Sequence, residues 1–188
     1  MQVHNPARNL AFAFSLALAV CSVSPAVRAQ AQKRDLNSIH IRLAREVRHE
    51  LLLLPNYNLF DDLEFVITDR DTVVLLGQVT RPSLKSDAET AILSLEGVGK
   101  VIDKIEVLPL SLSDDRIRLA GYHAIFSKPC LEKYGVRAVP PIHIIVKDGN
   151  LTLVGTVANE ADKDLVGIAA KEVPGAFRVT NNLKIEKK

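Results

Sequence analysis

The strongest constraint on the fold of this chain is an internal repeat. Residues 73–79 read VVLLGQV and residues 151–157 read LTLVGTV, so the two blocks lie 78 positions apart. The same separation aligns Gly97 with Gly175. Several blocks that recur in one order are not expected by chance, and the sequence therefore predicts two copies of one fold.

Each copy alternates helical and strand patterns in the order helix, strand, strand, helix, strand. The short turn between the first two strands predicts an antiparallel hairpin. The helix that follows predicts a right-handed parallel crossover to the third strand. We therefore expect an α+β fold of two tandem αββαβ modules over residues 36–110 and 114–187. Each module should be a three-stranded mixed sheet with two helices packed on one face.

The element boundaries follow from capping and helix-breaking residues. An IRLA segment at 41–44 recurs at 117–120, and this similarity aligns the first helices of the two copies. In copy one we expect a helix from Asn37 or Ser38 to Leu54, strands over 63–68 and 72–79, a helix from Pro82 to Gly97 and a strand over 100–108. In copy two we expect a helix over 116–126, strands over 142–146 and 150–157, a helix over 160–173 and a strand over 178–186.

Residues 1–29 resemble a secretory signal peptide. Arg8 lies in a short polar start, Leu10–Val20 is an apolar run of 11 residues, and Val27 and Ala29 are small enough for a signal peptidase. The run is too short to span a bilayer, which takes ~20 residues. The alternatives are a buried helix or an N-terminal anchor. We expect cleavage after Ala29 and a periplasmic location.

The two cysteines bear on the same question. Cys21 lies in a segment that resembles a lipoprotein box, in which the cysteine would be acylated. The preceding Val20 fits poorly because that position normally holds a small residue, so a soluble exported protein is favoured over a lipid-anchored one. Cys130 is then the one thiol of the mature chain, and we expect it to be a partly buried residue without special reactivity.

Composition and motifs favour a non-catalytic protein without metal or cofactor. A formal net charge of +2 argues against a basic nucleic-acid binder. The five histidines lack zinc-ligand spacing, and neither a phosphate-binding glycine loop nor a G-x-S-x-G segment occurs. The paired acids Asp61-Asp62 and Asp114-Asp115 are expected to be solvated caps, not glycosidase carboxylates.

The blocks around the repeated glycines resemble the BON domain family. The family pattern matches residues 71–79 with 97–101 in copy one, and residues 149–157 with 175–183 in copy two. The resemblance covers nearly all of the chain after residue 29. It implies a non-catalytic module of the cell envelope, usually described as phospholipid-binding, with no catalytic residues to transfer.

Four repeated glycines are expected to have structural roles. Gly97 and Gly175 suit a positive φ at a helix end. Gly77 and Gly155 suit a bend or a close approach in the second strand of each copy.

The charge distribution favours copy two as the phospholipid-binding copy. Residues 30–110 hold 10 basic and 13 acidic residues, whereas residues 111–188 hold 12 basic and 9 acidic residues. On the last helix, Ile168 projects away from the core in the same outer half as Lys163 and Lys171. An exposed apolar residue near two lysines suits an anionic phospholipid surface. An ordinary solvated helix and a domain–domain contact are the alternatives.

Two other functions stay open at this stage. One is a periplasmic stress-response protein that stabilises protein clients. The other is a glycan or peptidoglycan module, which the absence of Trp and the presence of only three Tyr disfavour. The sequence does not indicate an oligomeric state.

Overall fold

The computed structural model describes residues 25–68 and 71–186. The apolar core of the expected signal peptide and Cys21 lie outside the described residues. The chain divides after Asp35, and the compact unit that starts at Leu36 holds both copies. We call residues 36–110 module 1 and residues 111–186 module 2. Cleavage after Ala29 stays a prediction.

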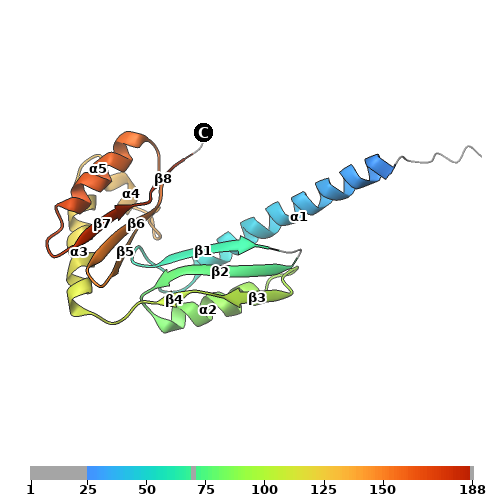
Figure 1. The fold of residues 1–188 in the computed structure, drawn as a ribbon, viewed down its shortest axis with the longest axis horizontal. Helices are drawn as coiled ribbons and strands as arrows, with labels where there is room; N and C mark the ends of the chain where they lie inside the picture. The colour runs from blue at the N-terminus through green and yellow to red at the C-terminus, as the bar shows by residue number, and fades with distance from the viewer. Residues whose placement is uncertain (1–24, 69–70, 187–188) are drawn as a thin grey trace, which may run out of the picture. The chain divides into compact units, whose positions relative to one another are not determined.

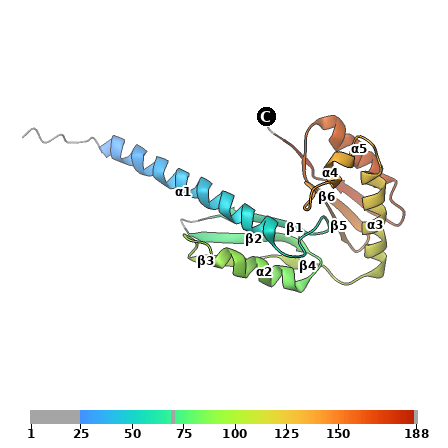
Figure 2. The same cartoon turned by 180° about the vertical axis from the view of Figure 1, so that it is seen from behind.

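Module 1 is a mixed sheet with two helices on one face (Figures 1 and 2). β2 is the central strand, because β1 pairs with it antiparallel and β3 and β4 pair with it parallel on the other side. The elements are α1 (Pro25–Leu53), β1 (Asp62–Ile67), β2 (Thr72–Val79), α2 (Pro82–Leu93), β3 (Lys100–Asp103) and β4 (Glu106–Val107).

The core of module 1 follows from helical and strand periodicity. Leu43, Val47 and Leu51 recur every four residues on α1 and are buried. They pack in one cluster with the buried face of α2 and with alternate residues of β2. The residues that α2 and β2 contribute are Leu84, Ala88, Ile92, Val73, Leu75 and Val79.

The start of α1 differs from the prediction. An N-cap at Asn37 or Ser38 is wrong, because the helix begins at Pro25 and runs through both residues. The sequence between Pro25 and Leu36 is rich in Ala, Gln, Arg and Lys, which are good helix formers, and contains no glycine. Nothing in that stretch ends a helix, and proline suits the first helical turn.

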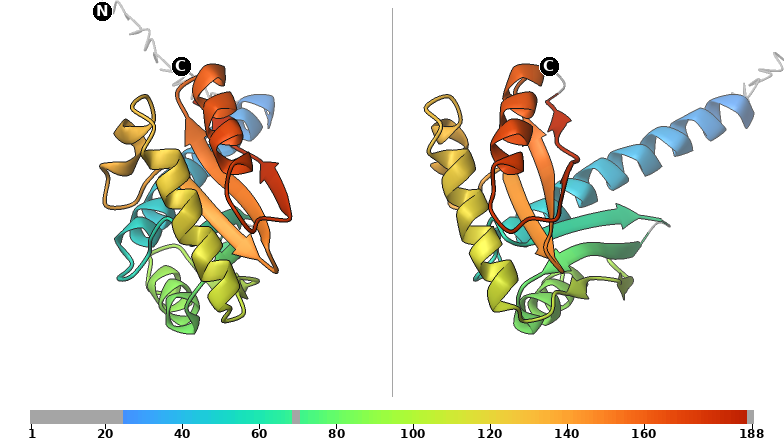
Figure 3. Two further views of the ribbon diagram at one scale, coloured as in Figure 1. Left: turned by 90° about the vertical axis from the view of Figure 1, so that its left-hand side faces the viewer. Right: turned by 60° about the vertical axis from the view of Figure 1, so that its left-hand side comes forward.

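Module 2 repeats the plan of module 1 with one additional element. Figure 3 shows α3 and α5 side by side on one face of the sheet, whose central strand is β6. The short helix α4 has no counterpart among the described residues of module 1, and it was not predicted. The elements are α3 (Leu112–Phe126), α4 (Glu132–Gly135), β5 (Ile142–Lys147), β6 (Asn150–Val157), α5 (Glu160–Lys171), β7 (Arg178–Asn181) and β8 (Lys184–Ile185).

The third strand of each module is interrupted, although a continuous strand was predicted. In module 1 the Asp103 side chain accepts a hydrogen bond from the Ile105 amide at 2.8 Å. In module 2 the Asn181 side chain accepts one from the Leu183 amide at 3.2 Å. A side chain that bonds the backbone two residues ahead turns the chain locally. The strand therefore divides into β3 and β4, or into β7 and β8, which pair with the same central strand.

The burial pattern also corrects the alignment of the first helices. Ile41 is exposed whereas Ile117 is buried, and Leu43 is buried whereas Leu119 is exposed. The two IRLA segments are therefore not structurally equivalent. Four-residue spacing of buried positions instead pairs Leu43, Val47 and Leu51 of α1 with Ile117, Gly121 and Ile125 of α3. The α+β fold of two repeated modules is confirmed. In the first helices, the repeat is seen in the spacing of buried residues and not in the identical IRLA segments.

The two modules share part of their interior. Leu59 and Phe60, which precede β1, pack against the core of module 2. The amide of Ile144 on β5 donates to the Leu59 carbonyl at 2.7 Å. A short segment of module 1 is thus added to the outer edge of the module 2 sheet.

Candidate functional site

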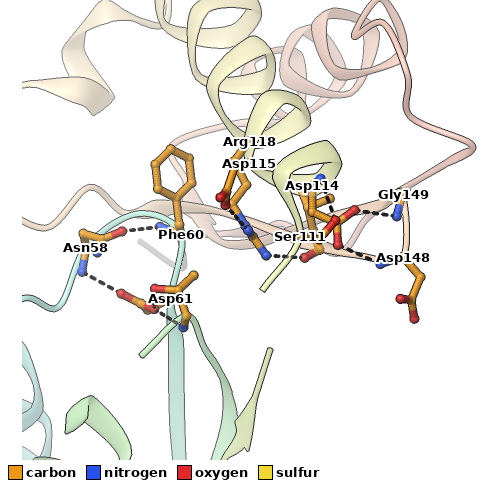
Figure 4. A network of polar contacts seen from close by, with 11 residues as sticks. Asn58, Phe60, Asp61, Ser111, Asp114, Asp115, Arg118, Asp148 and Gly149 are labelled. Carbon is orange, nitrogen blue, oxygen red and sulfur yellow. Dashed lines mark hydrogen bonds and ion pairs between the residues drawn. The ribbon is translucent and has the colours of Figure 1, made fainter. Parts of the chain in front are cut away.

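The junction between the modules holds a buried carboxylate from module 1 (Figure 4). Asp61 is fully buried and accepts hydrogen bonds from the Thr80 amide at 2.6 Å and the Thr80 hydroxyl at 2.8 Å. The amide of Asn58 donates to its second oxygen at 3.3 Å. These bonds fasten the segment before β1 to the end of β2, which positions residues 57–60 against module 2.

A second buried carboxylate organises the start of module 2. Ser111 caps α3 by accepting a hydrogen bond from the Asp114 amide at 3.2 Å. The Asp114 carboxylate accepts the amides of Asp148 at 3.0 Å and Gly149 at 2.9 Å, which ties α3 to the β5–β6 turn. The expectation of solvated caps is therefore wrong for Asp61 and Asp114, because both are buried and hold backbone donors.

Arg118 of α3 lies in the same region (Figure 4). It is buried, pairs with Asp115 at 2.5 Å and donates to the Val146 carbonyl at 2.6 Å. Its Nε finds no hydrogen-bond partner within the described residues. A buried guanidinium needs partners such as the Asp115 carboxylate and the Val146 carbonyl to offset the loss of water. Arg118 is therefore best explained as a structural residue that links α3 to β5.

An aromatic contact also joins the modules. The rings of Tyr57 and His143 stack with their centroids 5.6 Å apart. Burial lowers the pKa of His143, although the backbone carbonyls of Asp61 and Asn58 accept hydrogen bonds from it and favour the charged form. Its Nδ1 is buried without a partner among the described residues. His143 therefore stays neutral near pH 7.

Two cavities adjoin the junction. One of about 450 Å³ lies near the segment that connects the modules. The other, of about 650 Å³, extends along β1. The first is lined by Asn58, Phe60, Thr80, Arg81, Leu108, Pro109, Leu110, Asp115, Arg118 and Leu119. Both volumes fall within the range of ~300–1,000 Å³ that is typical of ligand pockets.

The outer side of α3 is an exposed apolar surface near cations. Leu112 is 81% exposed and Leu119 is 55% exposed, and they lie seven residues apart on one helix face. Arg116 and His123 occupy the same face, and both are exposed. Tyr122 borders it. This combination of leucine and basic side chains is typical of helices that lie on membrane surfaces.

The outer side of α5 contains the three residues predicted from sequence. Ile168 is 56% exposed, Lys171 is exposed and Lys163 is partly exposed. Asp164 and Glu172 lie four residues to either side of Ile168, so the charge around it is nearly balanced. α5 alone is therefore a weaker binding surface for an anionic membrane than the sequence indicated. Because α3 and α5 cover the same face of the sheet (Figure 3), their outer sides form one layer.

We define the helical face as a set of exposed or partly exposed residues on the outer sides of α3 and α5, each of which is apolar or basic. They are Leu112, Arg116, Leu119, Tyr122, His123, Lys163, Ile168 and Lys171. Sequence reasoning found the α5 part and missed the α3 part. The available signal was the spacing of positions 112, 116, 119 and 123, which repeats every three or four residues.

The family model for the BON domain matches residues 42–109 and 131–187. The chain belongs to the BON domain family. Its two BON modules account for the internal repeat. The family is associated with phospholipid binding and with periplasmic or envelope proteins, and it is generally non-catalytic.

Other comparisons add little to this assignment. No curated protein matches the chain. Two solved structures of CdsD, a structural protein of the type III secretion system of Chlamydia trachomatis, match at 13% identity with a TM-score of 0.29. One of them is its C-terminal domain. The matches cover 78% of this chain and 98% and 94% of those chains. A TM-score this low does not support any conclusion about the fold or function of this chain.

The repeated glycines of the BON modules allow backbone conformations and close contacts that other residues do not. Gly77 and Gly155 both have φ of +116°, and a Cβ at either would overlap the carbonyl of the adjacent strand, at Asp62 and Pro141 respectively. Such a close approach admits only glycine. Gly97, with φ of +91°, lies after the C-cap of α2 at Ser94, so the helix ends earlier than predicted.

Gly175 behaves like Gly97. Its φ is +84°, and it follows the C-cap of α5 at Glu172. Both residues therefore act in the turn after the helix and not at the helix end itself.

The remaining expectations concern reactive and metal-binding groups. Cys130 is exposed, so the expectation of partial burial is wrong. It lies in the segment that connects α3 to α4. Across the described ranges, no cluster of three or more histidine, cysteine or acidic residues could hold a metal ion. In the same ranges, no helix has the length and apolar character needed to cross a bilayer.

Proposed function

We propose that this protein is exported and binds the anionic phospholipid surface of the cell envelope through the helical face of module 2. The observation that carries the proposal is the exposure of Leu112 and Leu119 beside Arg116 on α3. Lys163, Ile168 and Lys171 on α5 extend that face. The BON family's association with phospholipid binding supports the same ligand class.

The energetics favour a reversible, salt-sensitive contact. A leucine side chain contributes roughly 1.5–3 kcal/mol when fully buried, and these two would be partly buried in a membrane interface. Each basic residue near an anionic surface contributes about 1 kcal/mol, and this attraction is screened by salt. Asp115 does not oppose binding strongly, because its charge is paired with Arg118.

Vesicle flotation tests the proposal. The full-length chain is produced in a bacterial host that exports it, and intact mass identifies its N-terminus. The protein is mixed with phosphatidylcholine vesicles with and without phosphatidylglycerol, at low and moderate salt. We expect binding to the anionic vesicles only, with less binding as salt rises.

Two double variants separate the apolar and the electrostatic contributions. Leu112→Ser with Leu119→Ser should weaken binding about tenfold or more, since two exposed leucines no longer enter the interface. Lys163→Glu with Lys171→Glu should weaken binding at low salt by a similar factor. Leu93→Ser on α2 is the matched control, because Leu93 is 54% exposed in module 1 and should leave binding unchanged.

A competing surface in module 1 must be tested in parallel. On the outer side of α1, Arg42 and Arg45 are exposed near Ile41 and Leu52. Loss of binding in Arg42→Glu with Arg45→Glu, together with full binding of both module 2 variants, would move the site to module 1. Absence of binding to anionic vesicles at low salt would reject phospholipid as the ligand.

A further inference from the structure

The two BON modules differ at the turn between their first two strands. The repeat offset of 78 pairs Asp71 with Gly149, and it also pairs Gly99 with Phe177. The backbone contact is the same in both copies. The Gly99 amide donates to the Asp71 carbonyl at 2.8 Å, and the Phe177 amide donates to the Gly149 carbonyl at 2.9 Å. Module 1 therefore presents an exposed acid at this place, where module 2 presents an aromatic ring.

Phe177 is both exposed and held in place. It is 87% exposed, although a Cβ on Gly149 would lie 2.5 Å from its Cδ2 atom, so the ring packs directly on that glycine. Gly149 has φ of +74°, a conformation that also favours glycine. The loop that carries Phe177 lies against α3, because a Cβ on Gly175 would be 3.5 Å from Cγ1 of Ile117. The ring is thus supported from below and open to solvent on its other sides.

The same turn brings Phe177 to the end of module 2 where α3 begins. The Gly149 amide donates to the buried Asp114 carboxylate at 2.9 Å (Figure 4). Leu112, two residues before Asp114, is the first residue of α3 and is 81% exposed. Two large apolar side chains from different elements therefore lie exposed at one end of the module.

Two arginines accompany these apolar side chains. Arg116 follows Leu112 by one helical turn, and Arg178 is the neighbour of Phe177 in the chain. Both arginines are exposed, and neither forms an ion pair within the part of the chain that the structure describes. We call Leu112, Arg116, Phe177 and Arg178 the apolar tip.

The acids around the apolar tip offset its positive charge only in part. Asp148 is exposed and has no ion pair among the described residues. Asp115 pairs with Arg118, and Glu106 pairs with Lys147. Two unpaired cations therefore face one unpaired acid, which leaves the apolar tip with a modest positive charge.

We propose that Phe177 inserts into an anionic phospholipid bilayer as an anchor of module 2, with Leu112 beside it. Aromatic side chains favour the membrane interface, and guanidinium groups bind lipid phosphates with charge-assisted hydrogen bonds. A projecting ring suits a fluid surface, which can close around it. This inference rests on the proposed function, and it directs the start of α3 toward the membrane.

A fluorescence experiment tests insertion, because the chain contains no tryptophan. Phe177→Trp is introduced into the exported full-length protein, which is mixed with phosphatidylcholine–phosphatidylglycerol vesicles that carry brominated acyl chains. We expect a blue shift of the emission and quenching by bromine. Leu93→Trp on α2 is the matched control, since Leu93 is 54% exposed in module 1. Its emission should stay as it is in the free protein.

Vesicle flotation measures what the apolar tip contributes to binding. Phe177→Ala should weaken binding by about tenfold, because the ring no longer leaves water. Its circular dichroism should match that of the parent, since the ring is exposed. Arg178→Glu should weaken binding at low salt by about tenfold, because an attraction becomes a repulsion. Lys100→Glu is the control, since Lys100 is the exposed counterpart of Arg178 in module 1 and should leave binding unchanged.

The two measurements separate this inference from the proposed function. Flotation of the parent protein tests the proposed function, and quenching in Phe177→Trp tests insertion. The inference is overturned, and the proposed function stands, if the parent binds anionic vesicles while Phe177→Trp is not quenched and Phe177→Ala binds as the parent does. Equal quenching in Phe177→Trp and Leu93→Trp also overturns it. Absence of binding by the parent rejects both.

Discussion

β1 and β5 occupy the same position in two copies of one fold, yet their surroundings differ. Glu64 on β1 is exposed, whereas the equivalent His143 on β5 is buried. Val66 is 49% exposed, whereas its counterpart Ile145 is 3% exposed. The difference arises because residues 57–60 of module 1 lie against β5 and nothing comparable among the described residues lies against β1. Burial of a strand here is determined by a neighbouring segment and not by the fold of its own module.

The modules also satisfy equivalent backbone groups by different means. The Thr80 amide at the end of β2 is held by the Asp61 carboxylate. The equivalent Ala158 amide at the end of β6 is held by the Tyr134 hydroxyl at 2.9 Å. Tyr134 lies on α4, which has no equivalent in the part of module 1 that the structure describes. The Tyr134 hydroxyl donates in turn to Asp162 at 2.5 Å. The additional helix of module 2 therefore replaces a buried carboxylate of module 1.

A third difference concerns a pair of equivalent lysines. Lys85 of α2 lies 3.6 Å from Asp103 and donates to the Ile105 carbonyl at 2.6 Å. In module 2 Asn181 replaces the aspartate and donates to the backbone carbonyl of Lys163 at 2.9 Å. No ion pair of the Lys163 ammonium is present among the residues that the structure describes. The exchange of aspartate for asparagine therefore removes the acidic partner that Lys85 has in module 1.

The largest expected effect tests whether the two central strands are equivalent. Gly77→Ala and Gly155→Ala should each lower the free energy of unfolding by about 3 kcal/mol or more, because each Cβ would overlap a backbone carbonyl at positive φ. Gly97→Ala is the control: it also has positive φ but has free space around its Cβ, so about 1 kcal/mol is expected. Chemical denaturation followed by circular dichroism measures these values. Equal losses at Gly77 and Gly97 would contradict the steric argument.

A smaller effect should distinguish the two ways of holding the amide after the central strand. Asp61→Ala removes a buried, charged acceptor and leaves both Thr80 donors unpaired, so we expect a loss of about 3 kcal/mol. Tyr134→Phe removes a neutral hydroxyl and should cost about 1–2 kcal/mol. Urea unfolding at pH 7 measures both. A larger loss in Tyr134→Phe than in Asp61→Ala would show that the charged acceptor is not the stronger anchor.

The smallest expected effect is on the pH dependence of the free energy of unfolding, which arises because His143 of β5 is buried. Since the pKa of His143 is lowered in the folded protein, the unfolded chain binds more protons below pH 6.5 and stability falls as pH drops through that window. His143→Gln removes this titration and should make the unfolding free energy less dependent on pH between pH 7 and 5. Tyr57, Asp61 and Asn58 also face the ring, and Asp62 lies nearby with an opposite pH effect.

The difference between parent and variant isolates His143, because these neighbours are present in both proteins. His123→Gln on the exposed side of α3 is the matched control and should retain the parent's pH dependence. A parallel pH dependence in the parent and in His143→Gln would mean that the ring gains no protons on unfolding in this range.

Much of the fold was predictable because local patterns carry it. Apolar spacing on α2 and α5, the glycines in β2 and β6, and the short hairpin turns are visible in the sequence and require no distant contact. The site was less predictable. Ile168 is visible in the sequence because it breaks the apolar periodicity of its helix. The acids Asp164 and Glu172, four residues to either side of it, offset the charge of the neighbouring lysines. The exposed face of α3 was missed because the IRLA segments at 41–44 and 117–120 were aligned by sequence identity, whereas their buried positions differ.

The sequence by itself determined the repeat, the helix-strand-strand-helix-strand plan that both modules share and the two positions in β2 and β6 where only glycine fits, since these depend on neighbours along the chain. The tertiary structure alone decided which strand edges are covered. Leu59 and Ile144 are 85 positions apart, and no local pattern predicts their hydrogen bond. The same holds for the burial of Asp61, Asp114 and His143, because burial depends on how distant segments fill space around a side chain.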